Sequence, residues 1–202
     1  MAGSLFIVAA PSGAGKTTLV RGLLSRDAAV RLSVSYTTRA ARDGEVNGVA
    51  YNFTNVPDFL TRRDRGEFLE WAEVHGNFYA TSRQWLEDQL AGGHDVLLEI
   101  DCQGAEQVRQ VFPQAVSIFI LPPSFEVLEK RLRGRGTDSE EVIALRLTGA
   151  RDEMRQVDRF DYVIINNDLQ VALDELSTVV RAARLRTPLM RLRNPASFLP
   201  AV

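Results

Sequence analysis

The chain has 202 residues, of which 45% are hydrophobic and 25% are charged, the proportions of an ordinary globular domain with a buried core. Its formal net charge is −2, so there is no broad basic field and nucleic acid is not an expected partner. The single cysteine, Cys102, excludes an internal disulfide framework and suits a reducing compartment. No apolar run approaches the roughly 18 residues that a membrane span needs. The composition therefore predicts a cytoplasmic protein without a membrane partner, and it leaves the oligomeric state open, a homo-oligomer included.

Apolar runs alternate with helical patterns along most of the chain. Residues 4–10 predict a buried strand, and residues 15–25 carry leucines at helical spacing after a glycine-rich loop. Further strands are predicted at 95–101, 116–123 and 160–168, with helices at 104–112 and 169–185. This alternation predicts an α/β fold, a parallel sheet flanked by helices and joined by right-handed crossovers.

Two segments depart from this rhythm. Residues 35–83 are rich in turn-forming and aromatic residues and predict a small mixed lobe inserted into the sheet order. Residues 124–158 carry no strand signal and predict two helices, the second beginning after Ser139. We therefore divide the chain into a core of residues 1–34, 84–123 and 159–202, a lobe at 35–83 and a helical segment at 124–158.

The stretch "APSGAGKT", residues 10–17, matches the phosphate-loop pattern G-x-x-x-x-G-K-[ST] except that Ala10 replaces the first glycine. Glycines allow backbone N–H groups to point inward, and the helix that follows adds positive potential. Lys16 is one of only two lysines in the chain and is expected to reach the β- and γ-phosphates, while the Thr17 hydroxyl is expected to ligate Mg²⁺. We expect ATP to bind along the whole loop, which comprises Ala10, Pro11, Ser12, Gly13, Ala14, Gly15, Lys16 and Thr17.

Four longer stretches, residues 35–53, 66–82, 97–105 and 131–141, together resemble the guanylate kinase family along nearly the whole chain. The resemblance implies a P-loop NTPase-type core, an inserted GMP-binding lobe at 35–83 and a mobile lid at 124–158. It also implies Mg²⁺-dependent transfer of the γ-phosphate of ATP to GMP, giving ADP and GDP, with dGMP as a further acceptor.

The resemblance assigns the acceptor site to the inserted lobe. Arg39 and Arg42 are implied to bind the GMP phosphate, for which forked guanidinium donors are suited, and Tyr51 and Tyr79 to donate hydroxyl hydrogen bonds. Glu70 is implied to accept from guanine N1–H and N2–H₂, donors that adenine lacks at these positions. The remaining positions implied to contact GMP are Ser35, Thr81 and Asp101.

The metal and the lid are assigned in the same way. Asp101 is implied to lie between GMP and the metal, and Glu99 stands where the family often has aspartate, which suits Mg²⁺ or its bound waters. Asn166 matches a position near the adenine of ATP. Together with Lys16, the lid arginines Arg131, Arg135 and Arg146 are implied to neutralise charge during phosphoryl transfer.

Two alternatives stay open at this point. One is a P-loop kinase with another phosphorylated acceptor, such as a sugar phosphate, which would have no use for Glu70, Ser35 and Thr81. The other is a catalytically silent domain of guanylate kinase type that binds protein partners. Such a domain would not need Lys16 and Thr17.

Overall fold

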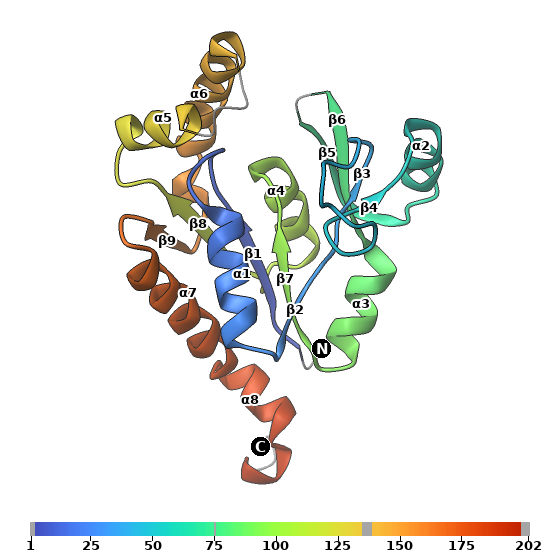
Figure 1. Cartoon of the computed structure of the whole chain (residues 1–202). Helices are drawn as coiled ribbons and strands as arrows, with labels where there is room; N and C mark the ends of the chain where they lie inside the picture. The colour runs from blue at the N-terminus through green and yellow to red at the C-terminus, as the bar shows by residue number, and fades with distance from the viewer. Residues whose placement is uncertain (1–2, 75, 135–138, 199–202) are drawn as a thin grey trace.

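The computed structural model describes residues 3–74, 76–134 and 139–198, and Figure 1 shows their arrangement. The central sheet has five parallel strands in the order β2 (Val30–Leu32), β7 (Asp95–Glu99), β1 (Leu5–Ala9), β8 (Val116–Leu121) and β9 (Tyr162–Ile165). Strand β1 lies in the middle and all five of its residues are buried. The predicted α/β fold with a parallel sheet is confirmed.

Helices cover both faces of this sheet, and the alternation of side chains along β1 decides which face each residue serves. Phe6 and Val8 pack with α1 (Lys16–Arg26) and α7 (Leu169–Arg184) on one face. Ile7 packs on the other face with α3 (Arg83–Ala91) and α4 (Cys102–Val111). Helix α4 begins two residues before its predicted start, because the Asp101 side chain accepts the Gly104 N–H and caps it at 2.8 Å.

A second, smaller sheet lies beside the core (Figure 1). Its order is β4 (Asn52–Phe53), β3 (Tyr36–Thr37), β6 (Asn77–Ser82) and β5 (Phe68–Val74), with β3 and β4 parallel and the other pairs antiparallel. Helix α2 (Val56–Asp64) buries Phe59 against Phe68, with the two ring centroids 4.8 Å apart. This sheet makes β5 an edge strand.

Helices α5 (Phe125–Arg133) and α6 (Glu140–Met154) stand at one end of the central sheet (Figure 1). They pack on each other through Leu128, Leu132 and Ala150. The Ser139 side chain accepts the Val142 N–H at 3.4 Å, so the predicted helix start at Ser139 is confirmed.

Helix α8 (Thr187–Arg193) is the last α-helix of the described residues, and the short 3₁₀ helices Val157–Arg159 and Pro195–Ser197 complete the described elements. Helix α8 extends from the end of α7, away from α5 and α6 (Figure 1). Among the helices of the described ranges, none is long and apolar enough to cross a membrane.

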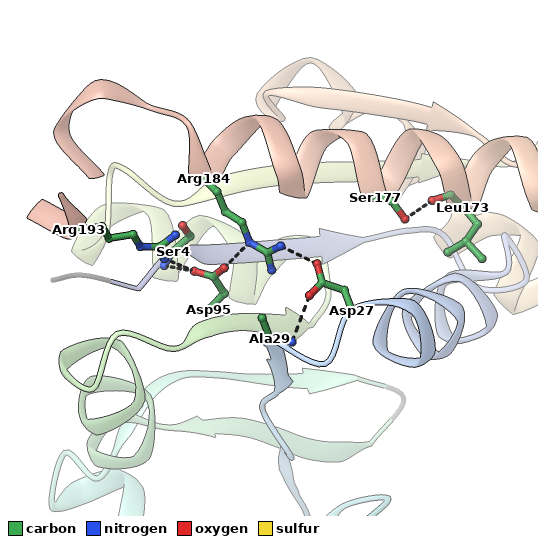
Figure 2. A network of polar contacts seen from close by, with 8 residues as sticks. All are labelled: Ser4, Asp27, Ala29, Asp95, Leu173, Ser177, Arg184 and Arg193. Atoms are coloured by element: carbon green, nitrogen blue, oxygen red, sulfur yellow. Dashed lines mark hydrogen bonds and ion pairs between the residues drawn. The ribbon is translucent and has the colours of Figure 1, made fainter. Parts of the chain in front are cut away.

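The amino-terminal end of β7 carries an ionic network centred on the buried Asp95 (Figure 2). The Asp95 side chain is only 4% exposed and accepts from Arg184 Nε at 2.6 Å, Arg193 at 2.9 Å and the Ser4 N–H at 2.8 Å. Arg184 also binds Asp27 at 2.7 Å. The network therefore joins the first strand, β7 and the two C-terminal helices at the end of the sheet opposite α5 and α6.

Candidate functional site

A cavity of about 630 Å³ opens at the carboxyl ends of β1 and β7. One wall is the loop between β1 and α1, the second is the small sheet through Tyr51, Glu70 and Tyr79, and the third is α6. The carboxyl ends of parallel strands are the usual place for ligands in open α/β sheets. Most of the residues expected to bind ATP, GMP and metal therefore border one space.

The loop at residues 10–17 has the backbone of a phosphate cradle. Gly13 and Gly15 have φ angles of 92° and 98°, a region that side chains with a Cβ rarely adopt. A Cβ at Gly15 would also lie 2.3 Å from the Asn166 amide nitrogen. Ala10 is buried at the end of β1, so the positions that need a glycine for conformation are the later ones, and the departure from the pattern at Ala10 leaves the cradle intact.

Two residues distant in sequence hold this loop from outside. The Asn166 amide donates to the Ala14 carbonyl at 2.7 Å, and Arg131 donates to the Ala14 carbonyl at 3.3 Å and to the Asn166 carbonyl at 2.9 Å. Asn166 is buried. The structure thus places both residues against the back of the cradle. Their predicted contacts with adenine and with phosphate remain predictions.

The carboxyl end of β7, with Glu99 and Asp101, meets Lys16 and Thr17 at the mouth of the loop. Lys16 Nζ donates to the Ile100 carbonyl at 2.8 Å, and the Thr17 hydroxyl donates a short hydrogen bond to Glu99. One carboxylate oxygen of Asp101 accepts the Gly104 N–H and caps α4, and Asp101 borders the same cavity. Within the described residues, no group of three or more His, Cys, Asp or Glu side chains is placed to hold a metal by itself.

Arg39 is oriented by a residue that the sequence analysis missed, Glu45. Arg39 Nη2 donates to both oxygens of the Glu45 carboxylate, at 2.9 and 3.0 Å, and the Arg42 N–H donates to the same carboxylate at 2.8 Å. The hydrogen bond from Arg39 lowers the pKa of Glu45. Arg39 also lies 5.3 Å from the ring centre of Tyr51. The sequence signal that could have identified Glu45 is its position three residues after Arg42.

Glu70 is a buried carboxylate facing the cavity. It is 4% exposed, and its Oε1 accepts the Thr81 hydroxyl at 2.6 Å. Burial raises the pKa of Glu70 to about 7, and the negative charge of Asp101 contributes to the rise. A buried acid that is short of hydrogen-bond donors is a receptor for a ligand that brings them. Ser35 lines the same cavity.

Helix α6 presents Arg146 and Glu153 to the cavity. Glu153, which the sequence analysis also missed, accepts a hydrogen bond from the Ser12 backbone, and its burial raises its pKa. It lies two helical turns after Arg146, a spacing that places both side chains on one face of the helix. Arg135, the remaining predicted catalytic arginine, lies outside the described residues.

The chain matches the family model described as Guanylate kinase over residues 2–183. It is 68% identical to a guanylate kinase of Aromatoleum aromaticum over 92% of this chain and 91% of the relative, and 62% identical to one of Dechloromonas aromatica over 98% of both. It is also similar to the crystal structure of guanylate kinase from Anaplasma phagocytophilum, with a TM-score of 0.77, 37% identity and 96% of each chain covered. These matches confirm the family resemblance and the interpretation as an enzyme.

Proposed function

The chain belongs to the guanylate kinase family and has guanylate kinase function, and we propose that the cavity described above carries that reaction with the residues assigned below. The observation that supports this assignment is a juxtaposition. A phosphate cradle and a buried carboxylate paired with Thr81 border the same space. The phosphates of ATP need an anion-binding loop, and the guanine of GMP needs hydrogen-bond acceptors. The cavity offers both.

The cradle and Lys16 bind the triphosphate of ATP. The N–H groups of residues 13–17 line the loop, and the start of α1 adds its dipole. Lys16 leaves the Ile100 carbonyl and neutralises charge on the phosphoryl group in transfer. Arg131 and Asn166 keep the loop in shape from behind, since both bond to the Ala14 carbonyl.

The oxygen atoms beside Lys16 fit Mg²⁺. Thr17 offers a hydroxyl whose proton is already directed to Glu99, and Asp101 adds a second carboxylate. Mg²⁺ keeps several waters and takes few protein ligands together with substrate phosphates, so an incomplete protein set suits it. When bound, it neutralises the β- and γ-phosphate charge and orients the oxygens. Thr17, Glu99 and Asp101 hold it directly or through its waters.

The small sheet binds GMP. Arg39, oriented by Glu45, and Arg42 receive the phosphate dianion with the hydroxyls of Tyr51 and Tyr79. Glu70 accepts from guanine N1–H and N2–H₂, with Ser35, Thr81 and Asp101 around the base. The dGMP base and phosphate present the same groups, so dGMP is accepted as well.

Residues 124–158 act as a lid that carries Arg135 and Arg146 toward the phosphates and excludes water. Arg131, which bonds to the Ala14 carbonyl in this structure, turns to the phosphates when they bind. A general base is not needed, because the second pKa of a phosphate monoester is roughly 6 and GMP is already largely a dianion at neutral pH. The reaction takes place in the cytosol, as the lone cysteine in the sequence suggests.

A coupled ADP-release assay with ATP, Mg²⁺ and each nucleoside monophosphate tests this proposal. GMP and dGMP are expected as acceptors. Glu70→Gln is expected to lower kcat/KM for GMP by about 10²-fold while the KM for ATP stays the same, because the site loses an acceptor for two donors. Glu67→Gln, an exposed carboxylate just before the same strand, serves as the matched control. Unchanged GMP kinetics in Glu70→Gln would contradict the role of Glu70.

A further inference from the structure

Helix α4 has a glycine, Gly104, directly beside the Glu70 carboxylate. Gly104 is buried, and a Cβ at this position would lie 2.6 Å from Glu70 Oε2 and 3.2 Å from its Cδ. The backbone of Gly104 is helical and does not have a positive φ. A glycine inside a helix costs about 1 kcal/mol relative to alanine. Gly104 is therefore not required for a special backbone conformation. Its missing side chain leaves room for the Glu70 carboxylate.

The same helix holds the backbone next to Glu70. The Gln107 side chain donates to the Trp71 carbonyl at 2.8 Å, and its Oε1 accepts the Trp71 N–H at 3.2 Å. Strand β5 is at the edge of its sheet, so these backbone groups have no neighbouring strand on this side. The Gln107 amide takes the place of that strand and sets the distance between β5 and α4.

These contacts leave the Glu70 carboxylate little freedom. Oε1 accepts the Thr81 hydroxyl at 2.6 Å, and Oε2 occupies space that a Cβ at Gly104 would need. Two parallel hydrogen bonds to a planar base edge require both oxygens to lie in the plane of that edge. A methyl group at position 104 would rotate or displace the carboxylate, and the hydrogen bond to the guanine 2-amino group would lengthen.

We propose that α4 is a specificity-determining support for the guanine site, in which Gly104 and Gln107 are positioning residues that act through Glu70. The inference rests on the assignment of Glu70 to guanine made above. Neither residue borders the cavity, so both act without touching the substrate. Gly104 also donates its N–H to Asp101 Oδ1 at 2.8 Å, so the readouts that report on Glu70 itself are base discrimination and the KM for the acceptor.

The test compares GMP with IMP, which lacks the 2-amino group, in the coupled assay on the full chain. Gly104→Ala is expected to raise the KM for GMP and to lower the GMP/IMP ratio of kcat/KM by about 10-fold, the size of one misplaced hydrogen bond in a specificity site. The KM for ATP is expected to stay within twofold. The melting temperature is measured on the same variant, because the helical gain from alanine is opposed by the 2.6 Å approach of the added methyl to Glu70 Oε2.

A rescue variant makes the test specific. Glu70→Asp shortens the side chain by one methylene and withdraws the carboxylate from the added methyl. In the double variant Gly104→Ala/Glu70→Asp, the loss of the GMP/IMP ratio is expected to be at least about fivefold smaller than the product of the two single losses. If the two losses simply multiply, Gly104 does not act through Glu70 and the proposal is overturned.

Gln107→Leu provides an independent arm, should Gly104→Ala fail to fold. It is expected to lower the GMP/IMP ratio about threefold, while Gln110→Ala, an exposed glutamine of the same helix, leaves the ratio unchanged. A normal ratio in Gln107→Leu contradicts the role of Gln107. Glu70→Gln distinguishes a failure of the guanine assignment from a failure of the supporting role of α4. If it leaves the ratio intact, the guanine assignment fails, whereas a strong effect of Glu70→Gln with a silent Gly104→Ala overturns this inference alone.

Discussion

Strand β7 has a carboxylate at each end, and the two are used in opposite ways. Asp95 at its start is buried and is bound by two arginines and a backbone N–H (Figure 2). Glu99 at its other end borders the cavity and shares the space with Asp101 and Lys16. The charge of Asp95 is balanced by arginines of the protein, whereas the charge of Glu99 faces a cavity that a ligand can enter.

The difference is visible in the neighbours of each cluster. At the amino-terminal end of β7, Arg184 lies between Asp95 and Asp27, and its hydrogen bond lowers the pKa of Asp27. At the cavity, Glu70 and Glu153 have raised pKa values because they are buried with few donors. At the amino-terminal end of β7 the charges are thus balanced within the protein, whereas the carboxylates of the candidate site are buried with few donors, which is a cost in stability that binding sites commonly carry.

The largest effect is expected from removing the cation at the cavity end. Lys16→Ala is expected to lower kcat by roughly 10²–10³-fold, because the charge of the transferred phosphoryl group loses its fixed countercharge. The melting temperature is expected to change little. Steady-state kinetics measure this, with Lys130→Ala as the control, since Lys130 is the other lysine and is exposed on α5. A Lys16→Ala enzyme within tenfold of the parent would refute the assignment.

At the amino-terminal end of β7, a substitution is expected to lower stability and to leave kcat unchanged. Asp95→Asn leaves two arginines without their shared anion and is expected to cost about 3 kcal/mol of unfolding free energy, or roughly 6–12 °C in melting temperature. The kcat at 20 °C is expected to stay near that of the parent. Asp174→Asn, which breaks the exposed pair with Arg26, serves as control and is expected to cost less than about 1 kcal/mol. Equal losses in the two variants would show that burial does not distinguish these pairs.

The smallest effect concerns the stability cost of the guanine site. Burial raises the pKa of Glu70 to about 7 in the folded chain, from 4.5 for an unperturbed glutamate. The folded state thus binds more protons between these values, and stability falls as pH rises through this window. Glu70→Gln removes the ionisation and is expected to stabilise the chain by about 2 kcal/mol at pH 8, after allowance for the burial of the amide.

At pH 5 the two chains are expected to be nearly equal in stability, because Glu70 is then protonated in the folded state. Urea unfolding at the two pH values measures the difference. A gain that is the same at pH 5 and pH 8 would place its origin in packing and would remove the ionisation argument.

Local patterns were enough to predict the β1–loop–α1 unit and the parallel sheet. An apolar run, a glycine loop and leucines at helical spacing each depend on neighbours in sequence, so the phosphate cradle at 10–17 could be read directly. The candidate acceptor residues came from the family resemblance, which supplied roles but not contacts. Glu45 and Glu153 were not identified from the sequence. Glu45 has a fixed place after Arg42, but its pairing with Arg39 depends on the loop conformation, and Glu153 is a single acid among many.

What the sequence by itself determined is therefore the class of fold, the family and the glycine-loop pattern at residues 10–17. The tertiary structure decided the strand order and which side chains support others. Asn166 and Arg131 reach the Ala14 carbonyl, and Gly104 gives room to Glu70. The physical reason is distance: periodicity and glycine loops act within a few residues, whereas these contacts join segments that only the packing of the sheets brings together.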